Sequence, residues 1–209
     1  MGVGGLWKTW WFLTGVILTV ALFVLAWVYP RFPGDERVLL AVQRWQTDWL
    51  DTVVLALTML GDWVVALPLL GLVILGLILT HRRADALVVT VSVVPMGLGH
   101  LFKMIVGRAR PDHFIAGADA SGLSFPSGHA VFALLFGGVL IVLANDLIRP
   151  FWVRLWVQTG LAFLVLAIGV SRVYIGVHWP SDIIGAYLFA AVSLLVILTL
   201  RNTLVSKGW

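Results

Sequence analysis

The sequence contains no cysteine, and charged residues make up only 11% of its 209 positions. Without cysteine the chain cannot form disulfides, thiolate metal sites or a cysteine nucleophile. A soluble domain carries about 25% charged residues, so the shortage of charge argues against a water-soluble protein. Dense runs of lysine and arginine are also missing, and the net charge is only +4. The pI near 10 therefore indicates membrane topology and no nucleic-acid partner.

Apolar residues are abundant instead. They make up 61% of the chain, whose mean hydropathy is +1.03. A membrane-spanning helix needs about 20 mostly apolar residues. The apolar segments predict an all-α polytopic membrane protein, a six-transmembrane-helix bundle that forms a single domain over residues 1–209. The predicted spans are Trp10–Tyr29, Trp63–Leu79, Ala86–Val106, Ser127–Asn145, Trp156–Val173 and Ser181–Leu200.

Two other interpretations of the apolar segments are less favoured. Lys8 precedes the first segment, as in a signal peptide, but the run is long for one and no small-x-small cleavage site follows it. We therefore expect this span to be retained. A transporter built from two inverted halves would repeat its polar positions in both halves, and this sequence does not.

Basic residues indicate how the chain is oriented, because cytoplasmic segments carry an excess of lysine and arginine. With the N-terminus in the cytoplasm, the inner segments are strongly basic and the outer segments are nearly balanced. We therefore expect cytoplasmic N- and C-termini in a bacterial inner membrane, with the active site on the periplasmic or extracellular side. The inner basic residues are Lys8, Arg82, Arg83, Arg149, Arg154, Arg201 and Lys207, against Asp85 and Asp146.

The first outer loop, Pro30–Asp62, has an amphipathic pattern that includes Trp45 and Trp49. Aromatic and charged side chains on opposite faces are typical of a helix that lies in the membrane interface. We expect one such helix here, with no catalytic role.

The remaining polar residues fall into three segments at the outer ends of the third to sixth spans: "KMIVGRARP", "FPSGH" and "SRVYIGVHWPSD". If they meet, Lys103, Arg110 and Arg172 suit a multiply charged anion such as phosphate. Ser127 is a suitable N-cap for the fourth span. The amides of Gly128 and His129 would then point outward as an anion site. The three segments therefore predict a phosphate-binding pocket.

Two histidines add possible chemistry to this pocket. Asp182 follows His178 by four residues, so it can fix one ring nitrogen and leave the other as a base or nucleophile. His129 has no carboxylate at a comparable spacing, and it could protonate a leaving oxygen. The alternatives are a purely structural His178–Asp182 pair, cations that snorkel to headgroups, and a two-histidine, one-carboxylate metal site. For Arg108, a phosphate contact and a plain surface role are both open, and His100 is a pocket wall or a buried histidine.

At these residues the sequence resembles the type-2 phosphatidic acid phosphatase superfamily of membrane lipid phosphatases. Its pattern K-x6-RP, PSGH and SR-x5-H-x3-D is matched from Lys103 to Asp182 with no departure. The resemblance implies a phosphohistidine on His178, activation by Asp182 and proton transfer by His129. It also implies that phosphate is bound by Lys103, Arg110, Ser127, Gly128 and Arg172.

The resemblance implies a metal-independent hydrolase without cofactors, acting in the bilayer on a lipid phosphate or diphosphate. Candidate substrates are phosphatidylglycerol phosphate, phosphatidate, diacylglycerol pyrophosphate, undecaprenyl diphosphate and the lipid A phosphates. The alternative is a non-catalytic protein that binds or transports lipid phosphates. The sequence does not define the oligomeric state.

Overall fold

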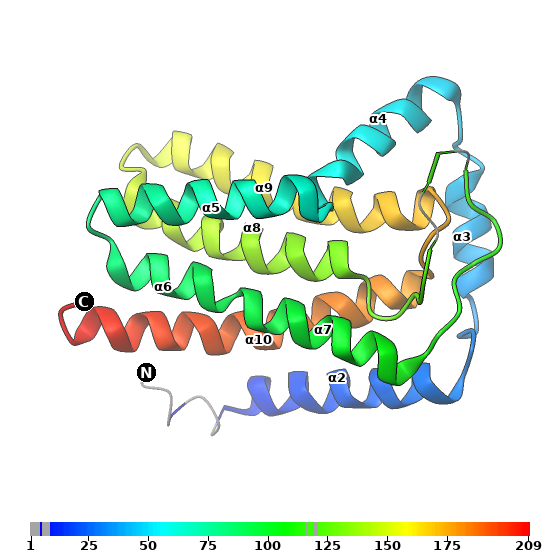
Figure 1. The fold of residues 1–209 in the computed structure, drawn as a ribbon, viewed down its shortest axis with the longest axis horizontal. Helices are drawn as coiled ribbons and strands as arrows, with labels where there is room; N and C mark the ends of the chain where they lie inside the picture. The colour runs from blue at the N-terminus through cyan, green and yellow to red at the C-terminus, as the bar shows by residue number, and fades with distance from the viewer. Residues whose placement is uncertain (1–4, 6–8, 116, 119–120) are drawn as a thin grey trace.

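The computed structural model describes residues 5, 9–115, 117–118 and 121–209, and every regular element within them is a helix. Figure 1 shows long helices lying side by side, with α3 set across one end of the bundle and α4 leaning away from it. The helices are α2 (Trp10–Val28), α3 (Asp35–Gln43), α4 (Asp48–Thr58), the 3-10 turn η1 (Met59–Gly61), α5 (Trp63–Leu79), α6 (Arg83–Val91), α7 (Val93–Val106), α8 (Gly128–Leu147), α9 (Phe151–Tyr174) and α10 (Pro180–Ser206).

Within the described residues, five helical segments are long and apolar enough to cross a membrane: α2, Arg83–Val106, α8, α9 and α10. Helix α5 has 17 residues and passes the same test only together with Asp48–Gly61, from which it is bent by 52°. The predicted all-α membrane bundle is therefore confirmed, with five or six spans. Lys8, which precedes the first span, lies outside the described residues.

The third predicted span is divided into α6 and α7 at Ser92. Pro95 has no N–H group, so it cannot donate to the carbonyl of Val91, where α6 ends. At the same break, the Ser92 hydroxyl donates to the carbonyl of Val89 at 2.6 Å. Proline therefore explains a break that hydropathy alone does not reveal.

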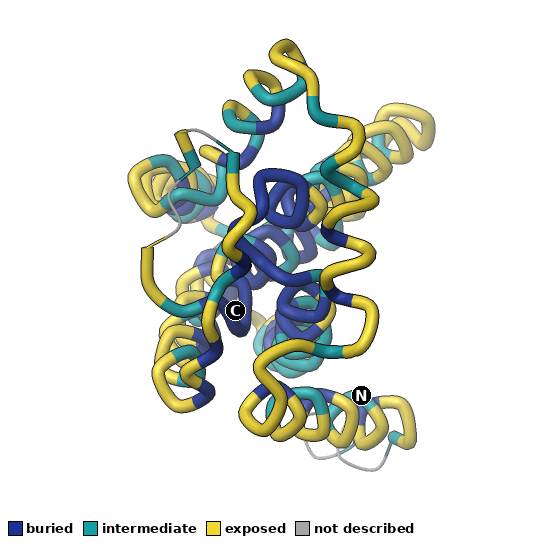
Figure 2. Tube along the Cα trace, turned by 90° about the vertical axis from the view of Figure 1, so that its right-hand side faces the viewer, coloured by how far each residue is buried: buried dark blue, intermediate teal, exposed yellow. Residues whose placement is uncertain are grey.

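Helix α8 is the central helix of the bundle. In its apolar window 56% of the residues are buried, against at most 33% in the other candidate spans. Figure 2 shows this arrangement end-on, with buried residues gathered in the middle and exposed ones outside. A Cβ on Gly137 or Gly138 would collide with Val165 of α9 or Leu194 of α10. These glycines therefore let α9 and α10 pack closely against α8.

The loop Pro30–Asp62 contains two helices, α3 and α4, where the sequence predicted one. Both are attached to the loops at this end of the bundle. The Gln43 side-chain amide donates to the carbonyl of His113 at 2.7 Å, and the Tyr174 hydroxyl donates to Asp51 at 2.6 Å. The loop therefore forms a fixed cover over the ends of the spans, because contacts far apart in sequence hold it there.

A network of ion pairs joins the helices at the opposite end of the bundle. Asp85 of α6 accepts from Arg82 Nε at 2.5 Å and from Arg201 Nε of α10 at 2.6 Å. Both arginines also pair with Asp146 of α8. Because Asp85 and Arg201 are buried, each depends on the other for charge compensation.

We expect Arg201→Met to lower the free energy of unfolding by about 3 kcal/mol, because it leaves buried Asp85 with less compensation. Thermal unfolding in detergent measures the effect. Lys207→Met, at an exposed position one turn or more beyond Arg201, is the matched control. Equal melting temperatures for the two variants would contradict the structural role of the network.

Candidate active site

The three polar segments meet at the end of the bundle that α3 covers (Figure 1). Together with the α4–α5 junction they surround a cavity of about 580 Å³. Its wall includes most of the residues that the sequence predicted: Lys103, Arg110, Gly128, His129, Arg172 and His178. Asp182 is fully buried behind His178, and Ser127 is buried next to Gly128. The folding of four helix ends toward one point thus produces a strongly cationic pocket.

His178 lies in the short connection between α9 and α10 and is only 1% exposed. Its Nδ1 is 3.3 Å from Oδ2 of Asp182, in the first turn of α10. A carboxylate only accepts hydrogen bonds, so this contact assigns the ring proton to Nδ1. Nε2 then keeps its lone pair for the cavity.

The surroundings of His178 favour its neutral form. Burial lowers the pKa of the His178 imidazole well below its usual value, and the positive charges of Arg172, Lys103 and Arg110 lower it further. A neutral imidazole is the form that can act as a nucleophile or base. His178 is therefore in the reactive state at neutral pH.

Asp182 is itself held in place by other groups. Its Oδ2 accepts from the Trp179 amide at 2.8 Å, and its Oδ1 accepts from Arg108 Nη1 at 2.5 Å. Arg108 is only 3% exposed. It therefore serves neither of the roles left open by the sequence, phosphate contact or plain surface residue, because its guanidinium is directed at buried carboxylates.

Arg108 also connects the site to helix α3. Its Nη2 donates to Asp35 Oδ2 at 2.7 Å, and its Nη1 donates to the Ser181 hydroxyl at 2.8 Å. Asp35 in turn accepts from the backbone amide and the hydroxyl of Ser181. Sequence reasoning missed this role of the loop Pro30–Asp62, because a charged residue in an amphipathic loop gives no local signal of its partner. Asp35 ties α3 to the first turn of α10.

The arginines of the pocket are oriented by fixed oxygen atoms. Arg172 Nη1 donates to the Thr58 hydroxyl at 2.9 Å, and Arg110 Nη1 donates to the carbonyl of Val177 at 2.9 Å. Thr58 comes from the end of α4, a further contribution of the loop that the sequence did not predict. Oriented guanidinium groups can bind phosphate oxygens without first losing side-chain freedom.

Ser127 occupies the N-cap position of α8, as predicted, but its side chain makes no capping hydrogen bond. Its hydroxyl is buried and has no hydrogen-bond partner among the described residues. A buried hydroxyl without a hydrogen-bond partner lowers the stability of the fold unless a ligand forms a hydrogen bond with it. The first-turn amides of α8 are also free of intrahelical acceptors. Hydroxyl and amides together fit an anionic oxygen at this helix end.

His129 does have a carboxylate partner, contrary to what its sequence neighbours suggested. Its Nε2 is 2.8 Å from Oδ1 of Asp62, which precedes α5, and 3.3 Å from Nη1 of Arg172. Asp62 is distant in sequence from His129, so spacing could not predict the pair. His100 is exposed and lines the cavity, which makes it a pocket wall and not a buried histidine.

The geometry offers little to a metal ion. No group of three or more histidine, aspartate or glutamate side chains in the described part of the chain is placed to ligate one. His129 and His178 are instead held by separate carboxylates, with three cations between and around them. This arrangement can bind a phosphoryl group, attack it and transfer a proton to the oxygen that leaves.

Several known proteins with similar sequence or fold carry phosphatase names. The chain is 30% identical over 161 residues to phosphatidylglycerophosphatase B of Bacillus subtilis, covering 74% of this chain and 76% of that one. It is 27% identical over 187 residues to an undecaprenyl-diphosphatase of Sulfolobus acidocaldarius, covering 83% and 85%. A crystal structure of a transmembrane PAP2-type phosphatidylglycerolphosphate phosphatase from Bacillus subtilis superposes with a TM-score of 0.73 at 25% identity, covering 92% of this chain and 96% of that one.

The model of the PAP2 superfamily matches residues 84–206, a range that contains all three motif segments and the helices that carry them. Motifs, fold and relatives therefore agree, and this chain belongs to the PAP2 superfamily.

Proposed function

We propose that this protein is a single-domain membrane lipid phosphatase that removes a terminal phosphate through a phosphohistidine formed on His178. The observation that carries the proposal is the buried His178, with Nδ1 held by Asp182 and its other side at a cavity lined by Lys103, Arg110 and Arg172. Phosphoryl transfer requires positioning and neutralisation of negative charge above all. This pocket supplies both, next to a neutral nucleophile.

In the first step, Nε2 of His178 attacks phosphorus and the bond from phosphorus to the leaving oxygen breaks. Asp182 stabilises the positive charge that develops on the His178 ring. His129 donates a proton to the leaving oxygen, which departs with the lipid. Lys103, Arg110 and Arg172, with Ser127 and the amide of Gly128, bind the other phosphate oxygens.

In the second step, water attacks the phosphohistidine. His129, now without its proton, accepts one from this water as the oxygen–phosphorus bond forms. The phosphorus–nitrogen bond breaks, inorganic phosphate is released and His178 returns to its neutral form.

The substrate is a lipid phosphate whose tail lies among the spans while its phosphate reaches the cavity. An apolar pocket of about 310 Å³ shares Lys103, His100 and Gly128 with the site and extends along α5, α7 and α8. Relatives that act on phosphatidylglycerol phosphate and undecaprenyl diphosphate support this class. Phosphatidate, diacylglycerol pyrophosphate and lipid A phosphates have the same chemistry.

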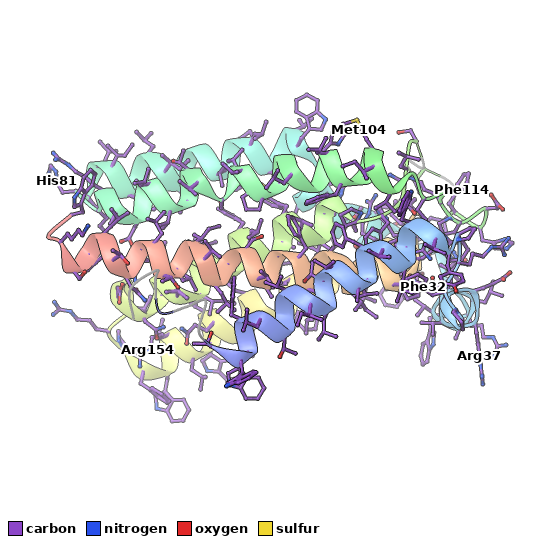
Figure 3. All side chains as sticks on the ribbon, turned by 90° about the horizontal axis from the view of Figure 1, so that it is seen from below. Phe32, Arg37, His81, Met104, Phe114 and Arg154 are labelled. Atoms are coloured by element: carbon purple, nitrogen blue, oxygen red, sulfur yellow. The ribbon has the colours of Figure 1, made fainter. Side chains whose placement is uncertain are left out.

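We further propose that the site opens to the periplasmic or extracellular side of a bacterial inner membrane, with both termini in the cytoplasm. Figure 3 shows His81 and Arg154 at one end of the bundle and Phe32, Arg37 and Phe114 at the other. Arg82 and Arg201, which pair with Asp85 and Asp146, lie with Arg154 at the first end, and these basic residues support this orientation.

His178→Ala should lower phosphate release from phosphatidic acid by at least about 1,000-fold, because it removes the imidazole nitrogen that forms the phosphohistidine. Release by purified protein in detergent is the measurement. His113→Ala, in an exposed loop histidine that does not line the cavity, is the control and should keep the parental rate. Hydrolysis by His178→Ala at the parental rate would contradict the mechanism. Lipid binding without hydrolysis by the parent protein would identify a non-catalytic binding protein.

Asp35→Asn should lower kcat about tenfold with little change in KM, because a weaker hold on Arg108 and Ser181 loosens Asp182 behind His178. The neighbouring Glu36→Gln removes the same charge from an exposed pair with Arg31 and should leave kcat unchanged. A change in KM alone for Asp35→Asn would show that α3 affects substrate entry and not the nucleophile.

Because the chain lacks cysteine, single cysteines can report its orientation. Phe114→Cys, in the exposed loop after α7, should react with a membrane-impermeant maleimide in intact cells. Lys207→Cys, at the other end, should react only after the cells are permeabilised. The reverse pattern would place the active site in the cytoplasm.

A further inference from the structure

We propose that Asp62 is a positioning residue for His129 that makes the site prefer lipid phosphomonoesters over lipid diphosphates. The inference rests on the proposed function, because it concerns the proton that His129 delivers to the leaving group. Its structural basis is the pair formed by Asp62 Oδ1 and His129 Nε2 at 2.8 Å, on the wall of the catalytic cavity.

The contact defines the state of His129. A carboxylate can only accept a hydrogen bond, so Nε2 of His129 must carry a proton. Burial and the positive charges of Arg172 and Lys103 oppose protonation of the ring, whereas the negative charge of Asp62 favours the doubly protonated form that a general acid requires. Arg172 lies 3.3 Å from the same nitrogen, but its Nη1 donates to Thr58. Asp62 is thus the group that holds the transferable proton in place.

A glycine next to Asp62 allows the backbone to lie close to the ring of His129. A Cβ at Gly61 would lie 2.5 Å from Cδ2 of His129, closer than side chains can approach. Glycine therefore allows the end of η1 to pass directly over the imidazole ring. The following residue, Asp62, is the N-cap of α5 at the 52° bend and reaches the ring nitrogen from there. Gly61 and Asp62 act as one unit that fixes His129.

The position of Asp62 has a consequence for the leaving group. An oxygen that receives the proton from Nε2 must lie beside that nitrogen, and so beside the carboxylate of Asp62. A monoester releases an alcohol there, which is neutral once protonated. A diphosphate releases a phosphate, whose remaining oxygens are negative and face Asp62. Repulsion between the negative leaving phosphate and the Asp62 carboxylate therefore opposes binding of the diphosphate and of its transition state.

Proton transfer from His129 to the leaving group also favours monoesters over diphosphates. An alkoxide is a poor leaving group and depends strongly on a general acid, whereas phosphate leaves with little help. A well-held imidazolium therefore accelerates monoester cleavage more than diphosphate cleavage. Because the Asp62 side chain is 46% exposed, water weakens the charge effect. We expect a combined preference of about tenfold.

The test compares kcat/KM for phosphatidic acid and for diacylglycerol pyrophosphate, which share the same lipid tail. The parent protein should favour phosphatidic acid. Asp62→Asn should lower the ratio of the two values at least about fivefold, by slowing the monoester, accelerating the diphosphate or both. Asp48→Asn removes an exposed acid at the same end of the bundle, away from the cavity, and should leave the ratio unchanged.

A pH profile separates this role from a purely structural one. In Asp62→Asn the alkaline limb of kcat for phosphatidic acid should move to lower pH, because the protonated imidazole loses its negative partner. The ionisable groups around His129 are Asp62 before α5, Lys103 on α7, Arg110 after α7, Arg172 on α9 and His178 before α10. Of these only Asp62 is negative, and the substitution leaves the others in place.

Each outcome is decisive. A lower ratio with a shifted alkaline limb supports the proposal. An equal loss on both substrates with an unshifted limb would show that Asp62 is merely structural, and a parent protein that prefers the diphosphate would overturn the predicted preference. Absence of phosphate release by the parent from either lipid would refute the proposed function itself, and the inference with it.

Discussion

The carboxylate of Asp182 is the contact on which the site depends. One oxygen faces Nδ1 of His178 and the Trp179 amide, and the other accepts from Arg108. A fully buried carboxylate is stable only when its charge is paired and its oxygens are hydrogen-bonded. Arg108 pairs with the charge of Asp182, and Asp35 in turn pairs with the charge of Arg108. The orientation of His178 therefore depends on a series of buried ionic contacts that ends at Asp35 on α3.

The cavity in front of His178 differs from these paired charges, because its charges are mostly positive. Lys103, Arg110 and Arg172 bring three positive charges to a cavity at the end of the spans. Three positive charges so close together near lipid are unfavourable in free energy unless an anion binds and neutralises them. In the proposed function, a phosphate enters this cavity while the lipid tail stays among the apolar helices. Asp62 introduces one negative charge, beside His129.

Several parts of this arrangement could be predicted from the sequence. Hydropathy located the spans, because about 20 apolar residues have few stable environments other than a bilayer. The pairing of His178 with Asp182 followed from their i, i+4 spacing. The N-cap position of Ser127 was also predictable, although its hydroxyl does not cap the helix. The division of the third span at Ser92 follows from Pro95 but was not expected.

The sequence by itself determined the apolar helices and the polar residues near their ends, because periodicity, length and local spacing are properties of neighbouring residues. Only the tertiary structure decided which of those residues meet. Asp62 reaches His129, Thr58 reaches Arg172, and Asp35 reaches Arg108 across long stretches of chain. Each of these contacts depends on how helix ends pack together. Packing is set by close approaches such as those at Gly61 and Gly137, which no local pattern encodes.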